Sequence, residues 1–143
     1  MNELMSAVEF HPNLDRVDKL AFLGSLSVFS VPALYGEAFG LYVIEAMAAG
    51  VPVVQPRTAA FPELIEATGG GVLCAPNDTQ ALADGIETLL LAPERARALG
   101  QAGARAVSEN FSAESMAQAS LRVYEQICSL SDAQPSTFNP RPT

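Results

Sequence analysis

Two acidic residues on either side of a glycine, Glu37 and Glu45, have the types and the spacing that suit ligand chemistry. The helix predicted from Leu41 to Ala49 is apolar on nearly every face, and Glu45 is its only charged residue. Burying an isolated carboxylate costs several kcal/mol unless it is paired or hydrogen-bonded, so Glu45 needs a partner. Because Glu45 lies one turn into the helix, it can point toward the loop that holds Glu37. A ligand hydroxyl is one candidate partner, and an arginine from elsewhere in the chain is the other.

The start of the same helix offers hydrogen-bond donors to an anion. Gly40 lets a phosphate approach the backbone closely, and free N–H groups around Phe39 to Tyr42 are reinforced by the helix dipole. The segment therefore suits a diphosphate, with one acid on each side of the helix start. A simpler interpretation is that Glu37 is merely an acid near a helix amino end.

The elements that must position these residues alternate between short apolar strands and helices. Such strands bury both faces and need a crossover between them, which is typical of a parallel sheet covered by helices on both sides. The fold class predicted is therefore α/β, with ligands at the carboxyl ends of the strands and attention directed to residues 32–41. Strands are expected at 8–10, 26–31, 52–55 and 71–74, and helices at 15–23, 40–50 and 61–67.

Three more helices are expected after the last strand. The last one has an apolar face at helical spacing, made of Met116, Ala119, Val123 and Ile127. Residues 129–143 hold three prolines and no apolar periodicity, so we expect a mobile tail after a domain of residues 1–128. The helices run from a cap at Asn77 or Asp78 to about 91, from Pro93 to about 107, and from a cap at Ser112 to about 128.

Composition narrows the class of partner. The formal net charge is −8, and the single lysine and seven arginines do not cluster, which argues against nucleic acid and anionic membranes. No run of 18 apolar residues exists and the first nine residues carry acids, so we expect neither a membrane span nor a signal peptide, and a cytoplasmic location. Cys74 and Cys128 lack metal-ligand spacing and are expected to be packing thiols, and His11 is expected at the surface.

The string from Glu37 to Val54 resembles the glutamate-x7-glutamate signature of the group 1 (family 4) glycosyltransferases, retaining enzymes with two facing Rossmann-like domains. The resemblance continues through 61–65, 70–73 and 76–78 and covers about residues 8–128. It implies an incomplete Rossmann-like domain with a helical carboxyl end. That domain would be the C-terminal, donor-binding half of a two-domain (GT-B) enzyme.

The resemblance also implies roles for particular residues. Glu37 would be the catalytic residue that holds hydroxyls of the transferred sugar, and Glu45 would accept hydrogen bonds from the ribose diol. The donor would be a nucleotide diphosphate sugar, with no metal or other cofactor and no protein nucleophile, because charge stabilisation is the main task of such sites. The donor-binding residues implied are Glu37, Ala38, Phe39, Gly40, Leu41 and Glu45.

Departures from the family pattern limit what we expect of the chain alone. The glycine-rich segment with an arginine and a lysine that neutralise the diphosphate is missing before Val8, and so is the N-terminal acceptor domain. We therefore expect the isolated chain to transfer sugar poorly or not at all. The alternative is a noncatalytic truncated fragment, or a subunit completed by another chain. The apolar face of the last helix and the first sheet edge favour self-association into a homo-oligomer.

Other α/β classes fit less well. A dinucleotide-dependent oxidoreductase needs a glycine fingerprint that opens a helix, whereas residues 69–71 precede a strand. A phosphate-accepting receiver domain needs an acid pair after its first strand and a late lysine, whereas Lys19 is the only lysine. Sugar epimerases and phosphorylases share the two-domain architecture and stay open on fold alone, but the glutamate pair favours transfer.

Overall fold

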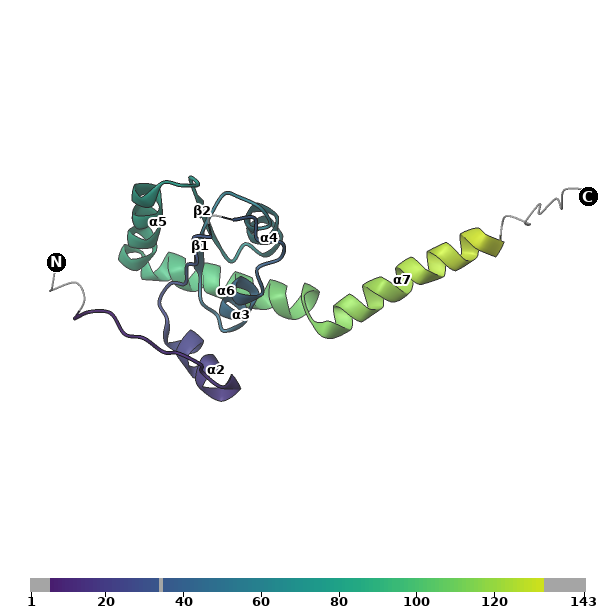
Figure 1. Cartoon of the computed structure of the whole chain (residues 1–143), viewed down its shortest axis with the longest axis horizontal. Coiled ribbons are helices and arrows are strands. Elements are labelled where there is room, and N and C mark those ends of the chain that lie inside the picture. Colours follow the sequence, from purple (N-terminus) through teal and green to yellow (C-terminus); the bar gives the residue numbers. More distant parts are fainter. Residues whose placement is uncertain (1–5, 34, 133–143) are drawn as a thin grey trace, which may run out of the picture. The chain divides into compact units, whose positions relative to one another are not determined.

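The computed structural model describes residues 6–33 and 35–132, and contacts divide the chain into two compact units at the junction of Val107 and Ser108. In the first unit, helices surround a small parallel sheet (Figure 1). The α/β prediction is therefore confirmed. The elements are α2 (Arg16–Ser25), α3 (Leu41–Ala48), β1 (Val53–Pro56), α4 (Phe61–Thr68), β2 (Gly71–Cys74), α5 (Thr79–Leu91), α6 (Pro93–Asn110) and α7 (Ala113–Asp132).

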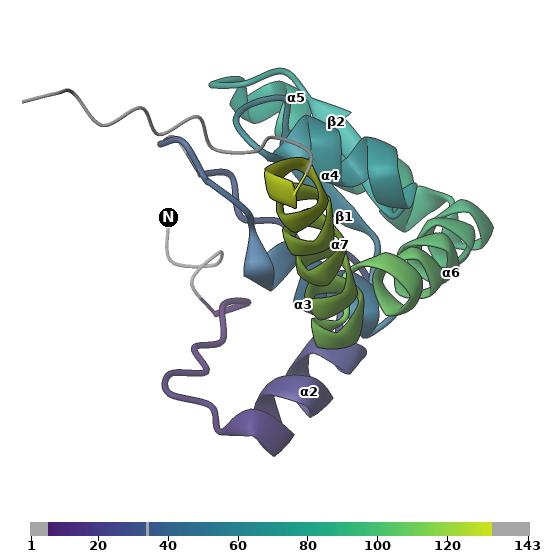
Figure 2. The same ribbon diagram turned by 90° about the vertical axis from the view of Figure 1, so that its right-hand side faces the viewer.

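The sheet is built from β1 and β2, which pair in parallel with Val53 opposite Gly71 and Pro56 opposite Cys74. Phe29 adds a single parallel bridge to Val53 on the other side of β1. The apolar, nonalternating β1 is buried at all four positions, as expected for a strand covered on both faces. Helices α3 and α5 contact β1, and α4 and α5 contact β2 (Figure 2).

Two of the predicted strands differ from the structure. Residues 8–10 form no strand, and Val8 and Phe10 are 47% and 79% exposed. A parallel strand needs a neighbour to satisfy its backbone groups, and nothing in the described residues pairs with this run. The segment 26–31 is strand-like only at Phe29, whose N–H donates to the carbonyl of Pro52.

Local capping explains where several helices begin. The carboxylate of Asp15 accepts a hydrogen bond from the Asp18 amide at 2.9 Å, and that of Asp78 accepts one from Ala81 at 2.9 Å. The Ser112 hydroxyl accepts from the Ser115 amide at 3.0 Å, as the cap predicted for the last helix requires.

The apolar core of the first unit lies between α3, β1 and α4. Its fully buried side chains include Val43, Met47, Val53, Val54 and Phe61. This core fixes α3, and with it the helix start that the sequence singles out.

The second unit contains α7, which runs four residues further than predicted, through Ser129 to Asp132. The prediction of a tail beginning at 129 is therefore wrong for these four residues, and residues 133–143 lie outside the described part of the chain. None of the helices in the described ranges combines the length and apolar character needed to cross a membrane.

Candidate functional site

The amino end of α3 is formed by a left-handed glycine and a nearby carboxylate. Gly40 has φ +81°, a conformation that glycine adopts without a steric penalty, and a Cβ there would come within 3.4 Å of Cε1 of Phe61. Glycine has no side chain to cap the helix. Glu37 takes that place, because its Oε1 accepts the N–H groups of Phe39 and Gly40, each at 3.2 Å.

A tyrosine holds the other oxygen of the same carboxylate. The hydroxyl of Tyr42 donates to Oε2 of Glu37 at 3.0 Å. The hydrogen bond from the Phe39 amide, followed by that from Tyr42, lowers the pKa of Glu37 below its usual value. Burial, reinforced by the hydrogen bond and charge of Glu37, raises the pKa of Tyr42 to about 12. At neutral pH Glu37 is therefore an anionic acceptor and Tyr42 a protonated donor.

These bonds correct one expectation about the helix start. The N–H groups around Phe39 to Tyr42 are predicted to be free for a phosphate, but those of Phe39 and Gly40 donate to Glu37. The reason is local: a glutamate two or three residues before a helix end can bend back onto its amides. An incoming anion therefore competes with Glu37 for these two donors.

Glu45 has a partner, but one that the sequence analysis did not name. Nζ of Lys19 donates to Oε1 of Glu45 at 2.6 Å, and the two side chains are 42% and 45% exposed. The expectation of a buried acid is thus wrong, because the group is half-exposed, and its partner within the chain is a lysine of α2 in place of the arginine considered. No sequence signal points to this pair, since the two residues are 26 positions apart and meet only through the packing of α2 against α3.

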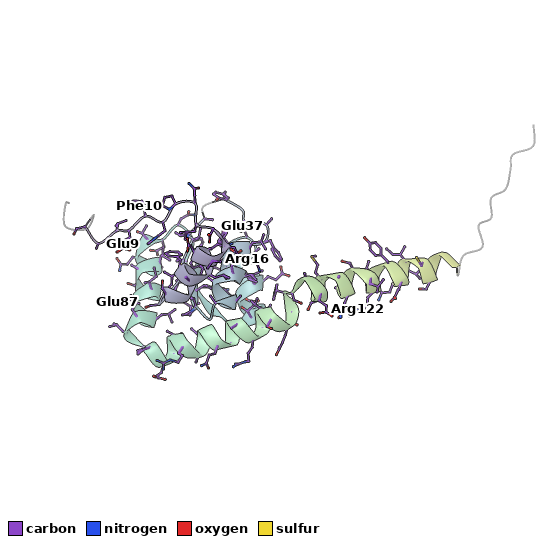
Figure 3. The ribbon with its side chains drawn as sticks, turned by 90° about the horizontal axis from the view of Figure 1, so that it is seen from below. Glu9, Phe10, Arg16, Glu37, Glu87 and Arg122 are labelled. Atoms are coloured by element: carbon purple, nitrogen blue, oxygen red, sulfur yellow. The ribbon has the colours of Figure 1, made fainter. Side chains whose placement is uncertain are left out.

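The two acids are held in different surroundings. Glu37 bonds to its own loop and to Tyr42, whereas Glu45 bonds across to α2, which packs against α3. Figure 3 labels Glu37 and Arg16 among the side chains of the first unit. A cleft of about 550 Å³ adjoins the ion pair, lined by Leu14, Asp15, Arg16, Lys19, Leu20, Leu23, Glu45 and Ala48.

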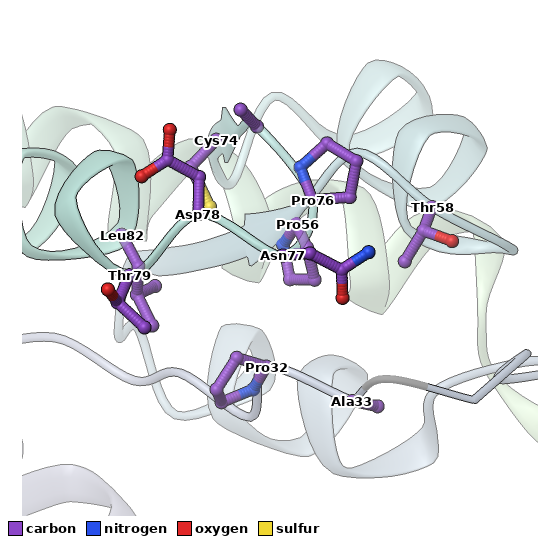
Figure 4. Close-up of a pocket in the computed structure, with 11 residues that line it drawn as sticks. Pro32, Ala33, Pro56, Thr58, Cys74, Pro76, Asn77, Asp78, Thr79 and Leu82 are labelled. Atoms are coloured by element: carbon purple, nitrogen blue, oxygen red, sulfur yellow. The ribbon is translucent and has the colours of Figure 1, made fainter.

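A second hollow lies where the sheet rule places ligands, at the carboxyl ends of β1 and β2 (Figure 4). The cavity measures about 450 Å³ and is mostly apolar. The loop after β1 connects it to the site, because the Ala60 amide donates to the backbone carbonyl of Glu37 at 3.2 Å. Two residues of the cavity lining, Pro32 and Ala33, fall within the segment 32–41 that the sequence singles out. The rest of the lining was not predicted: Pro56, Thr58, Cys74, Ala75, Pro76, Asn77, Asp78, Thr79 and Leu82.

Gln55 holds the wall of this hollow in place. Its side chain is fully buried in β1. With the amide oriented to satisfy both neighbours, its nitrogen donates to the carbonyl of Val31 at 2.8 Å and its oxygen accepts the Val31 amide at 3.3 Å. The side chain thus replaces a strand neighbour where the pairing of residues 26–31 with β1 ends.

The histidine and the two cysteines considered in the sequence analysis lie outside the two hollows described, except Cys74, which lines the second. The side chain of His11 is 43% exposed, and its ring centroid lies 5.1 Å from that of Phe22 in a tilted arrangement, in keeping with the surface position expected of it. Cys74 is half-buried, and burial raises the pKa of its thiol. Cys128 is exposed on α7, so the prediction that it packs inside is wrong.

Comparisons with known proteins show which family the chain resembles. Residues 2–106 match the family model described as glycosyl transferases group 1. The MMP alpha-(1->4)-mannosyltransferase of Mycolicibacterium hassiacum is 39% identical over 107 residues, which are 74% of this chain and 26% of that protein.

Solved structures share the fold. Sucrose-phosphate synthase from Thermosynechococcus elongatus superposes with a TM-score of 0.77 at 33% identity, over 90% of this chain and 32% of that one. The C-terminal domain of a group 1 family glycosyl transferase (LpcC) from Francisella tularensis gives 0.61 at 24% identity, over 74% of this chain and 53% of that one, and shows the fold alone.

The chain spans about a quarter of the mannosyltransferase and about a third of the synthase. The likeness to a C-terminal domain agrees with the half of the two-domain architecture that the sequence predicts. With the family model matching most of its length, the chain belongs to the group 1 glycosyl transferases.

Proposed function

We propose that this chain forms the donor-binding portion of a retaining glycosyltransferase, which moves a sugar from a nucleotide diphosphate sugar to an acceptor hydroxyl. The observation that carries the proposal is the carboxylate of Glu37, ionised and accessible, held at the amino end of α3 by two amides and a tyrosine hydroxyl. A fixed anionic acceptor beside a helix amino end suits a molecule that carries hydroxyls next to phosphates.

In this proposal Glu37 accepts hydroxyls of the transferred sugar. The carboxylate accepts hydrogen bonds from Phe39, Gly40 and Tyr42, and it is exposed enough to meet a ligand hydroxyl as well. The backbone from Ala38 to Leu41 meets the sugar and the diphosphate, and the dipole of α3 favours the negative charge there.

Glu45 accepts hydrogen bonds from the ribose diol, in competition with Lys19. Half-exposed ion pairs are typically worth about 0.2–1 kcal/mol, so Lys19 is easily displaced or shared. The cleft beside the pair has apolar walls from Leu14, Leu20 and Leu23, which suit the nucleoside.

The proposed reaction is a front-face displacement. The bond from the anomeric carbon to the diphosphate breaks, and its electron pair leaves with the phosphate oxygen. The acceptor hydroxyl attacks from the same face, and its proton passes to that departing oxygen. No protein nucleophile and no metal is assigned, and the charged groups serve to position and stabilise. We propose the cytoplasm as the location, where nucleotide sugars serve as substrates.

The second candidate is a noncatalytic role, as a truncated remnant or as a subunit completed by another chain. Two observations favour it: the amides of Phe39 and Gly40 are occupied by Glu37, and Glu45 is occupied by Lys19. The match covers about a quarter of the mannosyltransferase and about a third of the synthase, so sugar transfer by this chain alone is not expected.

Calorimetric titration separates the two candidates. UDP, GDP and ADP are titrated separately into the wild-type chain and into Glu45→Gln. The proposal predicts heat for at least one diphosphate and an affinity loss of roughly 5- to 20-fold in Glu45→Gln, the size expected for hydrogen bonds to a charged group.

The matched control is Glu87→Gln on α5, which makes the same chemical change on an exposed helix face and should bind like the wild type. An absence of heat with all three diphosphates would support the noncatalytic role.

A further inference from the structure

Tyr42 lies between the sheet and the carboxylate of Glu37. Helical side chains point back toward the amino end, which brings the hydroxyl of a second-position tyrosine over the loop that precedes the helix. Its ring packs against that of Phe29 with centroids 6.4 Å apart, and its hydroxyl donates to Oε2 of Glu37 at 3.0 Å.

Phe29 is itself fixed to the sheet. Its N–H donates to the carbonyl of Pro52 at 3.0 Å, and its own carbonyl accepts the Val54 amide at 3.0 Å. An unbroken series of contacts therefore leads from β1 through Phe29 and Tyr42 to the carboxylate. Fixing a half-exposed glutamate side chain on a loop costs conformational entropy, and these contacts offset that cost.

The two oxygens of Glu37 have different surroundings as a result. Oε1 accepts hydrogen bonds from the amides of Phe39 and Gly40, whereas Oε2 accepts one from the hydroxyl of Tyr42. The direction of Oε2 therefore depends on Tyr42, and a carboxylate oxygen can accept more than one hydrogen bond.

We propose that Tyr42 is a positioning residue that orients Oε2 of Glu37 toward a hydroxyl of the donor sugar. The inference rests on the proposed function and goes beyond it in one respect. Tyr42 strengthens the binding of the sugar and leaves the affinity for the nucleotide unchanged. Phosphates compete with Oε1 for the amides of Phe39 and Gly40, whereas Tyr42 bonds to Oε2, so loss of the tyrosine hydroxyl is felt chiefly by ligands that carry the sugar.

The test compares each nucleotide with its sugar derivative on the full chain. UDP, GDP and ADP are titrated beside UDP-glucose, GDP-mannose and ADP-glucose into wild type, Tyr42→Phe and the control Tyr35→Phe. Tyr35 lies on the same loop with 74% of its surface exposed, so the control removes a hydroxyl nearby. Circular dichroism and the melting temperature confirm that each variant is folded.

The expected result is that Tyr42→Phe weakens a nucleotide sugar by roughly 5- to 20-fold and leaves its parent diphosphate within twofold, while Tyr35→Phe changes neither. Equal weakening of both ligands would show that Tyr42 only supports the helix, and no change in either would show that it does nothing for Glu37. Both results would overturn the inference and leave the proposed function standing. A wild-type chain that binds none of the six ligands would instead remove the proposed function, and this inference with it.

Discussion

At the scale of single residues, the chemistry of this chain depends on local bonds around Glu37. Its spacing from Glu45 is visible in the sequence, and so is the glycine between them. The spacing does not reveal that the carboxylate folds back on Phe39 and Gly40, because that choice depends on which rotamer the loop allows.

The ion pair between Glu45 and Lys19 could not be predicted from the sequence for a different reason. Lys19 is 26 positions away, and the two meet only because α2 packs against α3. Helical periodicity predicts which face of each helix is apolar, but it does not say which two helices become neighbours. The bond between Tyr42 and Glu37 spans five residues and depends equally on the left-handed turn at Gly40.

The bonds to Glu37 predict a pH dependence of stability. Its pKa in the folded chain lies below the usual 4.5, so the ionised carboxylate stabilises the folded state above that pH, and the contribution is lost as the pH falls through the lowered value. The melting temperature of wild type should therefore exceed that of Glu37→Gln at pH 6, and the gap should shrink as the pH falls below 4.5 through the lowered pKa.

Glu87→Gln, on the exposed surface of α5, serves as the control for removing one acidic charge from a chain of net charge −8. A gap between wild type and Glu37→Gln that stays constant down to pH 3 would contradict the assigned hydrogen bonds.

At the scale of elements, the sequence predicted most helices because their caps and apolar faces are local. Asp78 and Ser112 cap α5 and α7 as expected, and β2 has the predicted bounds. The strands predicted at 8–10 and 26–31 are absent or reduced to a single bridge at Phe29. A strand forms only where a neighbouring segment pairs with its backbone groups, and apolar content alone does not supply such a neighbour.

The close packing of α6 was also invisible in the sequence. Gly100 of this helix faces the turn after α3, and a Cβ there would overlap the carbonyl oxygen of Gly50. Gly100→Ala should therefore destabilise the fold by about 1–3 kcal/mol, the usual cost of overpacking. Thermal unfolding followed by circular dichroism measures the effect.

Gly24→Ala provides the matched control. A Cβ at Gly24, in α2, meets nothing within 4 Å, so the same change should be neutral or stabilising by roughly 0.5–1 kcal/mol. Similar melting temperatures for the two alanine variants would show that α6 does not approach Gly50 as described.

At the scale of the whole molecule, the family assignment rests on a match over most of the chain, while the relatives extend well beyond it. The fold and the glutamate pair were predictable from sequence because both are encoded within one segment. Groups that would bind an acceptor were expected outside this segment, in the other domain of the two-domain architecture.

The uncovered face of α7 predicts self-association. Met116, Val123 and Ile127 share one side of the helix and are 68%, 52% and 58% exposed. Helical spacing places the charges of Glu114, Arg122 and Glu125 on the other sides. Two negatively charged chains meet most easily where neither is charged. Val123→Glu should therefore lower the weight-average mass in sedimentation at high concentration.

Leu121→Glu is the matched control, because Leu121 is 57% exposed on α7 but lies off that face. Equal effects of the two glutamate variants, or a wild-type chain that stays monomeric at all concentrations, would contradict self-association through this face.

The most direct test of the central claim is a map of amide chemical-shift changes in the ¹⁵N-labelled chain as UDP-glucose, GDP-mannose and ADP-glucose are added in turn. The account predicts that at least one of them shifts the amides of Phe39, Gly40, Leu41 and Tyr42 together with that of Glu45, and leaves α7 unchanged. Shifts confined to other parts of the chain, or none with all three nucleotide sugars, would contradict a donor site at the amino end of α3.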